Sequence, residues 1–211
     1  MDGFARERAA MVKKQMQDRD ISDPTVLAAM ESVPRHEFVP VESRDQAYAD
    51  WPLPIGYGQT ISQPYIVALM TQLAQVEPGD KVLEVGTGSG YQAAVLAEIT
   101  DSVYSVEIIP ELAAAARERL DSLGYAKVVT AVRDGYYGWE EHAPYDAIIV
   151  TAAPDHVPPS LVEQLAEGGR LVIPVGPPGF FQTLWLIEKT PEGIKRSSLG
   201  SVAFVPLTGQ H

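Results

Sequence analysis

The sequence predicts an α/β fold in which a mostly parallel sheet is covered by helices on both faces. Between residues 79 and 176, short apolar segments alternate with helical patterns, and this alternation is typical of parallel strands joined by helices. A glycine-rich stretch, Gly86 to Gly90, directly follows the first of these apolar segments. After Gly176, two apolar segments occur with no helix between them, which predicts an antiparallel hairpin at one edge of the sheet.

The length and composition exclude several classes of protein. The chain has 211 residues, which predicts a single domain, and it has no cysteine, which excludes disulfides, thiolate zinc sites and a cysteine nucleophile. Its formal net charge of −12 opposes non-specific binding to nucleic acid or to an anionic membrane. The same charge does not oppose a cationic ligand.

Metal and targeting signals are absent from the sequence pattern. No apolar run approaches ~20 residues, and residues 1–20 lack the apolar centre of a signal peptide, so we expect no membrane span and a cytoplasmic location. The histidines have no metal-ligand spacing, so we expect no metal site. They are His36, His142, His156 and His211.

The N-terminal part predicts helices followed by a long irregular segment. Residues 4–32 predict two helices, the second of which begins at Asp23-Pro24 with a side-chain cap and then proline in the first turn. Residues 33–63 are rich in proline, glycine and aromatic side chains, and a long irregular segment of this kind is usually functional. We expect Trp51 and Tyr57 in this segment to pack in the core rather than to line a binding site.

From residue 64 onward, apolar periodicity assigns each element. A helix follows Gln63-Pro64, and Pro78-Gly79 then turns the chain into the first strand of the sheet. The later elements are expected as a strand at 82–85, a helix from 91, a strand at 103–107, a helix at 110–123, strands at 127–133 and 146–151, a helix at 159–165, a strand at 170–174 that begins after a turn at Gly168-Gly169, and hairpin strands at 183–189 and 195–207.

The stretch that begins at Glu84 predicts a ligand site. Its spacing, Glu84-x-Gly86-x-Gly88-x-Gly90, differs from the Gly-x-Gly-x-x-Gly of dinucleotide-binding folds, and the lysine and Ser/Thr of a P-loop are missing. Glycines at a strand end let a ligand approach the backbone closely, and the helix that follows offers free N–H groups. An acid two residues before the first glycine is unfavourable for a pyrophosphate and suits a cationic ligand. A tight turn without a ligand is the alternative.

Two more acids end the next strands of the predicted sheet. Glu107 occupies the place where an acid of a doubly wound fold accepts hydrogen bonds from ribose hydroxyls. Asp134, followed by Gly135, could accept a hydrogen bond from the exocyclic amine of adenine. The alternatives are a solvated carboxylate at Glu107 and a simple turn at Asp134-Gly135. Together with Glu84, these acids predict a nucleoside that carries positive charge and no phosphate.

This constellation resembles the S-adenosylmethionine site of the Rossmann-like methyltransferases, and residues 5–208 are similar to the protein-L-isoaspartate O-methyltransferase family. Many methyltransferases share the glycine loop, whereas the segment Gly-Gln-Thr-Ile-Ser-Gln-Pro, residues 58–64, is far more specific to this one family. The remaining matching segments are 82–91, 134–135, 145–153, 168–176 and 204–207.

The resemblance implies both a fold and an activity. The fold is a Rossmann-like doubly wound sheet with N-terminal helices, in which we expect an N-terminal helical and substrate-binding part (1–78), a cofactor-binding core (79–176) and a C-terminal β extension (177–211). The activity is methyl transfer from S-adenosyl-L-methionine to the free α-carboxylate of L-isoaspartyl residues, after which the ester closes to a succinimide that hydrolyses in part to aspartate. The implied partners are isoaspartyl peptides and damaged proteins, and we expect a monomer that binds neither nucleic acid nor membrane.

The resemblance also assigns roles to individual residues. Ser62 matches the family's catalytic serine and would hold the substrate carboxylate. Its place before the next helix also makes it a candidate helix cap or near-cap, and both roles could hold at once. Thr60 and Ile61 would line the peptide groove, and Val205 would supply backbone contacts to the peptide. The expected cofactor-binding residues are Glu84, Gly86, Thr87, Gly88, Ser89, Gly90, Glu107, Asp134 and Gly135.

The implied chemistry agrees with the lack of an assembled catalytic base in the sequence. A carboxylate with a pKa of ~3.5–4 is already ionised at neutral pH, and the sulfonium cofactor supplies the leaving group. A nucleic-acid methyltransferase is an alternative, but the strand at 146–151 ends in Thr-Ala-Ala-Pro rather than Asn/Asp-Pro-Pro-Tyr, and the acidic charge opposes it. The chain could also be a non-catalytic nucleoside-binding protein, and an NAD oxidoreductase is less favoured still because of the glycine spacing.

Overall fold

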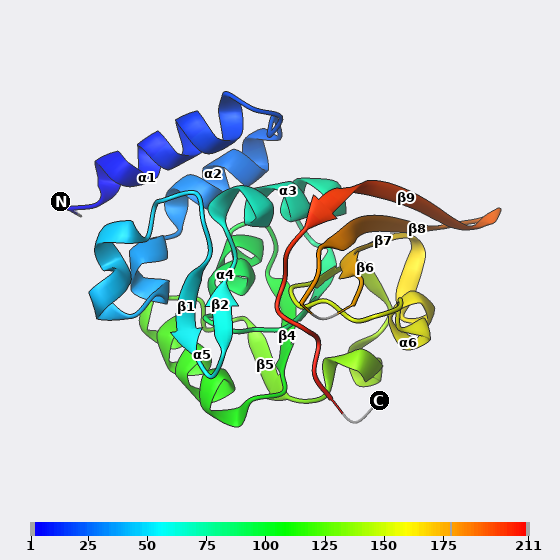
Figure 1. Cartoon of the computed structure of the whole chain (residues 1–211). Helices are drawn as coiled ribbons and strands as arrows, with labels where there is room; N and C mark the ends of the chain where they lie inside the picture. The colour runs from blue at the N-terminus through cyan, green and yellow to red at the C-terminus, as the bar shows by residue number, and fades with distance from the viewer. Residues whose placement is uncertain (1–2, 178, 210–211) are drawn as a thin grey trace.

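The protein, described by a computed structural model at residues 3–177 and 179–209, is built on one central sheet (Figure 1). Its strands are β3 (Lys81–Val85), β4 (Ser102–Glu107), β5 (Val129–Val132), β6 (Tyr145–Val150), β7 (Leu165–Val175), β8 (Gln182–Thr190) and β9 (Gly193–Val202). The sheet order is β5-β4-β3-β6-β7-β8-β9. The five strands from β5 to β7 are parallel, and β8 and β9 form the predicted antiparallel edge.

The order of the strands reverses at β3, which pairs with β4 on one side and with β6 on the other. Where the order reverses, the connections leave in opposite directions, and a crevice opens at the carboxyl ends of the two strands. The glycine stretch follows β3 at this reversal point. The predicted ligand site therefore lies where a doubly wound sheet places one.

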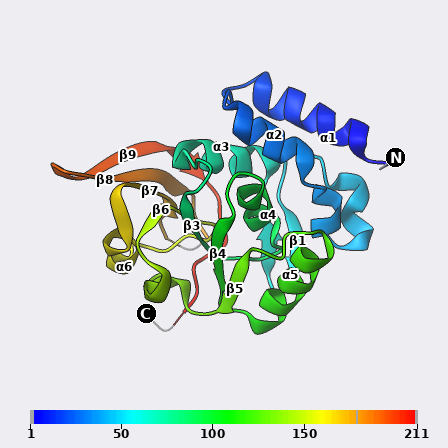
Figure 2. The same cartoon turned by 180° about the vertical axis from the view of Figure 1, so that it is seen from behind.

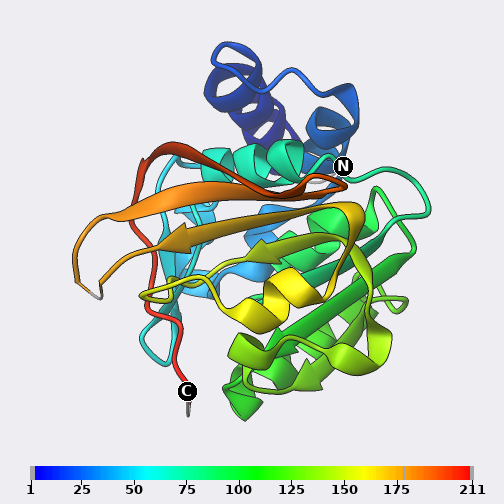
Figure 3. The same cartoon turned by 90° about the vertical axis from the view of Figure 1, so that its right-hand side faces the viewer.

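Helices cover both faces of the sheet. They are α1 (Ala5–Met11), α2 (Pro24–Ser32), α3 (Pro64–Ala74), α4 (Tyr91–Ala97), α5 (Pro110–Ser122) and α6 (Pro159–Glu163), with a π-helical turn η1 (Val12–Gln17) and the 3₁₀ turns η2 (Arg35–Phe38), η3 (Val41–Gln46), η4 (Gly135–Tyr137) and η5 (Glu140–His142). One core contains side chains of α1 to α4 and Leu120 of α5, and the other contains Leu161 of α6. Figure 2 shows α4 and α5 beside the parallel strands. Figure 3 shows α6, in yellow, in front of the other face of the sheet.

Alternate residues of each central strand enter different cores. In β3, Val82 belongs to the core under α4, whereas Leu83 and Val85 belong to the core under α6. In β6, Ile149 and Ile148 divide in the same way. Because both faces are buried, these strands appear in the sequence as continuous apolar runs rather than as alternating patterns.

The segment at 33–63 is more ordered than the sequence predicts. Besides η2 and η3, it contains a two-stranded antiparallel hairpin, β1 (Leu53–Gly56) and β2 (Gln59–Ile61). Tyr57 and Gly58 make the turn with φ of 53° and 72°, the left-handed conformation of a tight hairpin turn. The prediction that Trp51 and Tyr57 pack in the core is wrong, because they are 51% and 61% exposed. Tyr57 is part of the hairpin turn and Trp51 precedes β1, so neither lies on a strand or helix that packs against a core.

Two strand boundaries also differ from the predicted ones. Gly168 and Gly169 do not precede β7 but lie within it, as an irregularity between the pairs Tyr145–Leu165 and Ala147–Arg170. The last strand ends at Val202 rather than at residue 207. Beyond it, the main-chain N–H of Phe204 donates to the side chain of Gln182, so the chain leaves the sheet edge and continues beside the loop after β6.

In the part of the chain that the structure describes, no helix combines the length and the apolar character needed to cross a membrane.

Candidate active site

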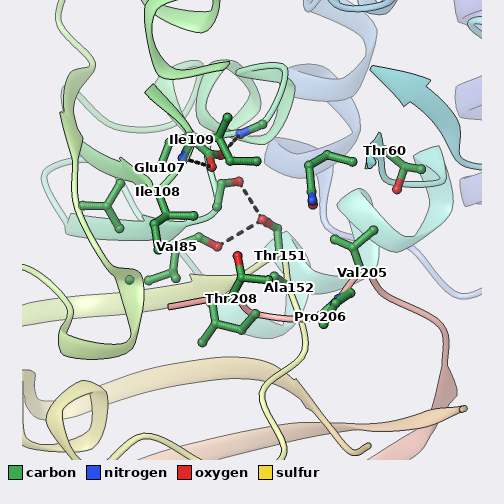
Figure 4. A pocket seen from close by; sticks show the side chains of 16 residues that line it. Thr60, Val85, Glu107, Ile108, Ile109, Thr151, Ala152, Val205, Pro206 and Thr208 are labelled. Atoms are coloured by element: carbon green, nitrogen blue, oxygen red, sulfur yellow. Dashed lines mark hydrogen bonds between the residues drawn. The ribbon is translucent and has the colours of Figure 1, made fainter. Parts of the chain in front are cut away.

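Three adjoining cavities that share lining residues lie at the carboxyl ends of β3, β4 and β6. We call them the main cavity (between the glycine loop and residues 205–208), the neck (between the glycine loop and Ser62) and the groove (between residues 60–66 and residues 201–205). Thr60 and Thr151 line all three. A group in the groove and a group in the main cavity can therefore meet at these two threonines. Figure 4 shows the main cavity from close by.

The glycine loop brings its backbone against neighbouring elements at distances that exclude a side chain. A Cβ on Gly86, which has a φ of 99°, would lie 2.4 Å from Thr151 Oγ1. A Cβ on Gly135 would lie 2.3 Å from a methyl carbon of Val85. Both glycines line the main cavity, so the backbone itself forms its wall.

Glu107 joins the end of β4 to the glycine loop. The side chain is only 6% exposed, and its two carboxylate oxygens accept hydrogen bonds from the main-chain N–H of Gly88 (2.8 Å) and of Ile109 (3.0 Å) (Figure 4). A carboxylate has about four acceptor positions, so these two bonds leave capacity for a ligand in the main cavity. This is the geometry that the ribose prediction requires.

Glu84 lies beneath the loop rather than on its surface. It is fully buried, it lines the neck, and its Oε2 accepts a hydrogen bond from Ser105 Oγ at 2.5 Å, while Oε1 has no hydrogen-bond partner among the described residues. Burial raises the pKa of Glu84 from 4.5 to about 8, and the nearby negative charge of Glu107 adds to the increase, while the Ser105 bond opposes it. The carboxyl group is therefore mostly protonated at neutral pH until a cation approaches.

Two predicted cofactor residues of the loop turn their side chains away from the main cavity. The hydroxyl of Thr87 bonds to Ser105 Oγ at 2.5 Å, and the hydroxyl of Ser89 accepts from the N–H of Tyr91 at 3.3 Å. The carbonyl of Ser89 accepts a hydrogen bond from Arg119 of α5. Thr87 and Ser89 line the neck, and their polar side chains hold the loop in shape.

Asp134 lies at the end of β5 but outside the lining of the main cavity. Its carboxylate caps η4 by accepting from the N–H of Tyr136 at 3.0 Å, and Gly209 lies against the same carboxylate. Gly135, the next residue, does line the main cavity. The contact of Asp134 with adenine stays a prediction.

Ser62 lies where the neck opens into the groove. The cap of α3 is Gln63, so Ser62 is not the cap itself but occupies the near-cap position directly before it, and α3 has no side-chain cap hydrogen bond. Among the described residues, the Ser62 hydroxyl makes no hydrogen bond, whereas its carbonyl accepts one from Arg35 Nη2 at 2.8 Å. The hydroxyl is therefore available to a group in the groove.

The remaining predicted substrate residues divide between the cavities. Thr60 is exposed and lies at the junction of all three cavities. Ile61, expected in the groove, is only 4% exposed and lines the neck instead. Val205 lines the main cavity and the groove, but its carbonyl already accepts a hydrogen bond from the N–H of Ala153 at 2.8 Å. Its main chain is therefore partly used within the protein.

Two residues of the site are missing from the sequence analysis. Thr151 directly follows β6, and its hydroxyl lies within hydrogen-bond distance of the carbonyls of Val85 (3.0 Å) and Gly86 (2.6 Å). Its place as a polar residue directly after the strand that pairs with β3 could have identified Thr151 as a site residue from the sequence. Arg35 is fully buried, its Nε donates to the carbonyl of Ala47 at 2.7 Å, and its guanidinium lies 4.8 Å from the ring centre of Tyr91. Nothing in the local sequence distinguishes this arginine from an exposed one.

The side chains around the three cavities do not favour a phosphate ligand. Among the described residues, no lysine or arginine lines any of the cavities, and the only acidic side chains are Glu107 in the main cavity and Glu84 in the neck. The groove has no charged lining residue in the described part of the chain. No group of three or more metal-ligating side chains is present in the described ranges. The arrangement suits a cationic nucleoside beside an uncharged groove.

Comparison with known proteins agrees with this site. Residues 6–211 match the family model described as Protein-L-isoaspartate(D-aspartate) O-methyltransferase (PCMT). A curated protein of Polaromonas sp. strain JS666, named protein-L-isoaspartate O-methyltransferase 2, is 61% identical to this chain over 189 residues, which cover 89% of this chain and 90% of that protein.

Two solved structures share the fold over almost the whole chain. One, named protein-L-isoaspartate O-methyltransferase, has a TM-score of 0.84 and 30% identity, and the match covers 96% of this chain and 66% of the other. The second, described as a protein-L-isoaspartate O-methyltransferase of Plasmodium falciparum in complex with S-adenosyl-L-homocysteine, has a TM-score of 0.83 and 27% identity, with 95% and 98% of the chains covered.

The raised pKa of Glu84 predicts how stability depends on pH. The folded protein holds a proton on Glu84 up to a pH of about 8, whereas the unfolded chain releases it near 4.5. The free energy of unfolding therefore falls as pH rises between these two values, because the unfolded state binds fewer protons there.

Glu84→Gln tests this pH dependence. The substitution should remove the contribution of Glu84 to the slope, and urea unfolding of the ligand-free protein across that pH range measures the change. The control Glu111→Gln, at an exposed acid of α5, keeps the wild-type slope. An unchanged slope in Glu84→Gln would contradict the titration.

Proposed function

The chain belongs to the protein-L-isoaspartate(D-aspartate) O-methyltransferase family, and we propose that its main cavity receives the methyl donor while Ser62 receives the carboxylate to be methylated. The enzyme transfers a methyl group from S-adenosyl-L-methionine to the free α-carboxylate of L-isoaspartyl residues in damaged proteins. The methyl ester then closes to a succinimide, and hydrolysis leads back to normal aspartate. The observation that carries the proposal is that Thr60 and Thr151 line all three cavities, so donor and acceptor sites meet there.

The residues of the main cavity fit the cofactor. Glu107 offers free acceptor positions for ribose hydroxyls, and the walls at Gly86 and Gly135 have no space for a Cβ. Buried Glu84 lies in the neck beside this cavity, and a nearby positive charge would favour the ionised form of its carboxyl group. Bound in this cavity, S-adenosyl-L-methionine supplies a methyl group on a sulfonium sulfur, which is a good leaving group.

Ser62 would hold the substrate carboxylate without lowering its reactivity. The carboxylate is ionised at neutral pH, since its ordinary pKa is ~3.5–4, so the protein needs no general base. A neutral hydroxyl donor orients this anion more gently than an arginine would, and a tight ion pair would reduce the nucleophilicity of the oxygen. The uncharged lining of the groove agrees with this requirement.

Arg35 acts on the substrate through Ser62 and is a positioning residue. Its guanidinium is fully buried and donates to the carbonyls of Ala47 and Ser62, and so it connects η3 to the segment that carries the serine. Burial lowers the pKa of Arg35 to about 10, which still leaves the side chain charged at neutral pH. A hydroxyl on a fixed backbone can align an oxygen with the methyl group, and such alignment is a large part of catalysis in a two-substrate reaction.

The biological setting is a further part of the proposal. The net charge of −12 and the absence of basic residues from the described cavity linings support protein and peptide substrates rather than nucleic acid. We expect a cytoplasmic monomer that works as one domain. Support for one domain comes from the core that joins Met16 of the N-terminal part to Val82 of the sheet and Leu186 of the C-terminal part.

The first test is the methylation of paired peptides. Two peptides that differ only in Asp or L-isoaspartate at one position are incubated with the enzyme and labelled S-adenosylmethionine. Base-labile methyl ester is expected only on the isoaspartyl peptide, because only it presents a free α-carboxylate on that residue. Equal labelling of both peptides would contradict the assigned substrate, and cofactor binding without labelling would favour a non-catalytic nucleoside-binding protein.

Ser62→Ala tests the substrate role of the serine. We expect kcat to fall at least ~10-fold, since a hydrogen bond to a charged group contributes about 1.5–3 kcal/mol. Calorimetry should show an unchanged affinity for S-adenosylhomocysteine, because the hydroxyl faces the substrate. Ser43→Ala, in η3 and outside the three cavities, is the matched control. Parallel losses of kcat and cofactor affinity would instead place Ser62 in the cofactor site.

Glu107→Ala tests the ribose contact. The dissociation constant of the cofactor is expected to rise ~10-fold or more, because charged hydrogen bonds of about 1.5–3 kcal/mol are lost and the support for Gly88 is removed. Calorimetric titration with S-adenosylhomocysteine measures the change. Glu111→Ala, at an exposed acid four residues further on, should bind as the wild type does. Wild-type affinity in Glu107→Ala would remove Glu107 from the site.

A further inference from the structure

The groove beside Ser62 is apolar on several sides. Most of its lining side chains are apolar, the rest are neutral and polar, and among the described residues none is charged, in a chain whose net charge is −12. An uncharged, mainly apolar hollow on an acidic protein has the character of a site for an apolar side chain of a peptide. The larger apolar lining residues are Pro52, Ile66, Phe181, Val202, Phe204 and Val205.

Phe181 is the lining residue with the most open aromatic surface. It is 78% exposed, in the turn between β7 and β8. Its neighbour Phe180 is exposed to a similar degree, 72%, but does not line the groove. Phe180 and Phe181 thus have the same side chain and similar exposure, but only Phe181 lines the groove. Figure 3 shows this turn on the same side of the molecule as the segment that follows β9.

Buried Gln182 holds the two sides of the groove together. It is 3% exposed, its Nε2 donates to the carbonyl of Phe180 at 2.7 Å, and its Oε1 accepts from the N–H of Phe204 at 2.8 Å. The turn that carries Phe181 and the segment that carries Phe204 are therefore joined before any ligand arrives. A preformed wall lowers the entropy cost of binding, so the open face of Phe181 can contribute to affinity.

We propose that the groove binds an apolar side chain of a residue flanking the isoaspartyl residue, and that Phe181 determines this preference. The inference rests on the proposed function, which places the isoaspartyl carboxylate at Ser62. Ser62 and Thr60 line the same groove as Ile66 and Phe181, so a peptide held at Ser62 can place a neighbouring residue against this apolar lining. An apolar side chain loses its contact with water there, whereas a charged one loses hydration and finds no described charged partner.

The test compares peptides in which one flanking position at a time carries Leu or Lys and every remaining position is Gly. For the wild type, we expect kcat/KM to be about 10-fold higher with Leu than with Lys at one flanking position, either directly before or directly after isoaspartate. Burying a leucine side chain favours binding by this order of magnitude. In Phe181→Ala this ratio should fall to about 3-fold or less, because part of the apolar wall is removed. The control Phe180→Ala should keep the wild-type ratio. Because the ratio is taken within each variant, a general loss of activity cancels.

Each outcome either supports or overturns the inference. A Leu/Lys ratio near one at every position in the wild type, or an equal fall of the ratio in both variants, overturns it and leaves the proposed function intact. Absence of methylation of every isoaspartyl peptide by the wild type overturns the proposed function, and the inference with it. A ratio that persists in Phe180→Ala and collapses in Phe181→Ala supports it.

Discussion

The site depends on the close approach of three strand ends around the glycine loop. Gly86 donates its N–H to the carbonyl of Val106 in β4 at 2.8 Å, and Thr151 donates its N–H to the carbonyl of Val85 in β3 at 2.9 Å. The hydroxyl of Thr151 then closes on the carbonyl of Gly86, where a Cβ would collide with it. This packing fixes the floor of the main cavity. It also puts Thr151 at the point where the main cavity, the neck and the groove meet, which is where we propose that methyl transfer occurs.

The two halves of the site differ in the charge of their lining residues. The cofactor side contains the acids Glu107 and Glu84, one bonded to two main-chain N–H groups and the other buried and proton-binding. The substrate side has no charged lining residue among those described. A cationic donor is therefore favoured on one side, and an anionic acceptor meets no competing carboxylate on the other. This division suits a reaction in which opposite charges on the two substrates neutralise each other as the methyl group moves.

Segments that are remote in the sequence complete the substrate side. The β1–β2 hairpin brings Thr60 to the junction, and Ile55 of the same hairpin lies within contact distance of the position that a Cβ on Gly88 would take. Residues 203–208 arrive from the other end of the chain and are held by Ala153 and Gln182. In Figure 1 the two segments lie beside each other in front of the strand ends. Neither segment belongs to the central sheet, and the chain directly after the hairpin is held where Arg35 donates to the carbonyl of Ser62.

Local sequence patterns were enough to predict the strands of the central sheet, the place of the glycine loop and Glu107 as a strand-end acid, because strand periodicity and glycine spacing are local properties. The remaining features depend on contacts between distant parts of the chain. The direction in which Thr87 and Ser89 turn, the exposure of Trp51 and Tyr57, the end of β9 at Val202 and the burial of Arg35 beneath Ser62 depend on neighbours far along the chain. The protonated state of Glu84 is of the same kind, since its pKa follows from burial that only the assembled layers of strand and helix create.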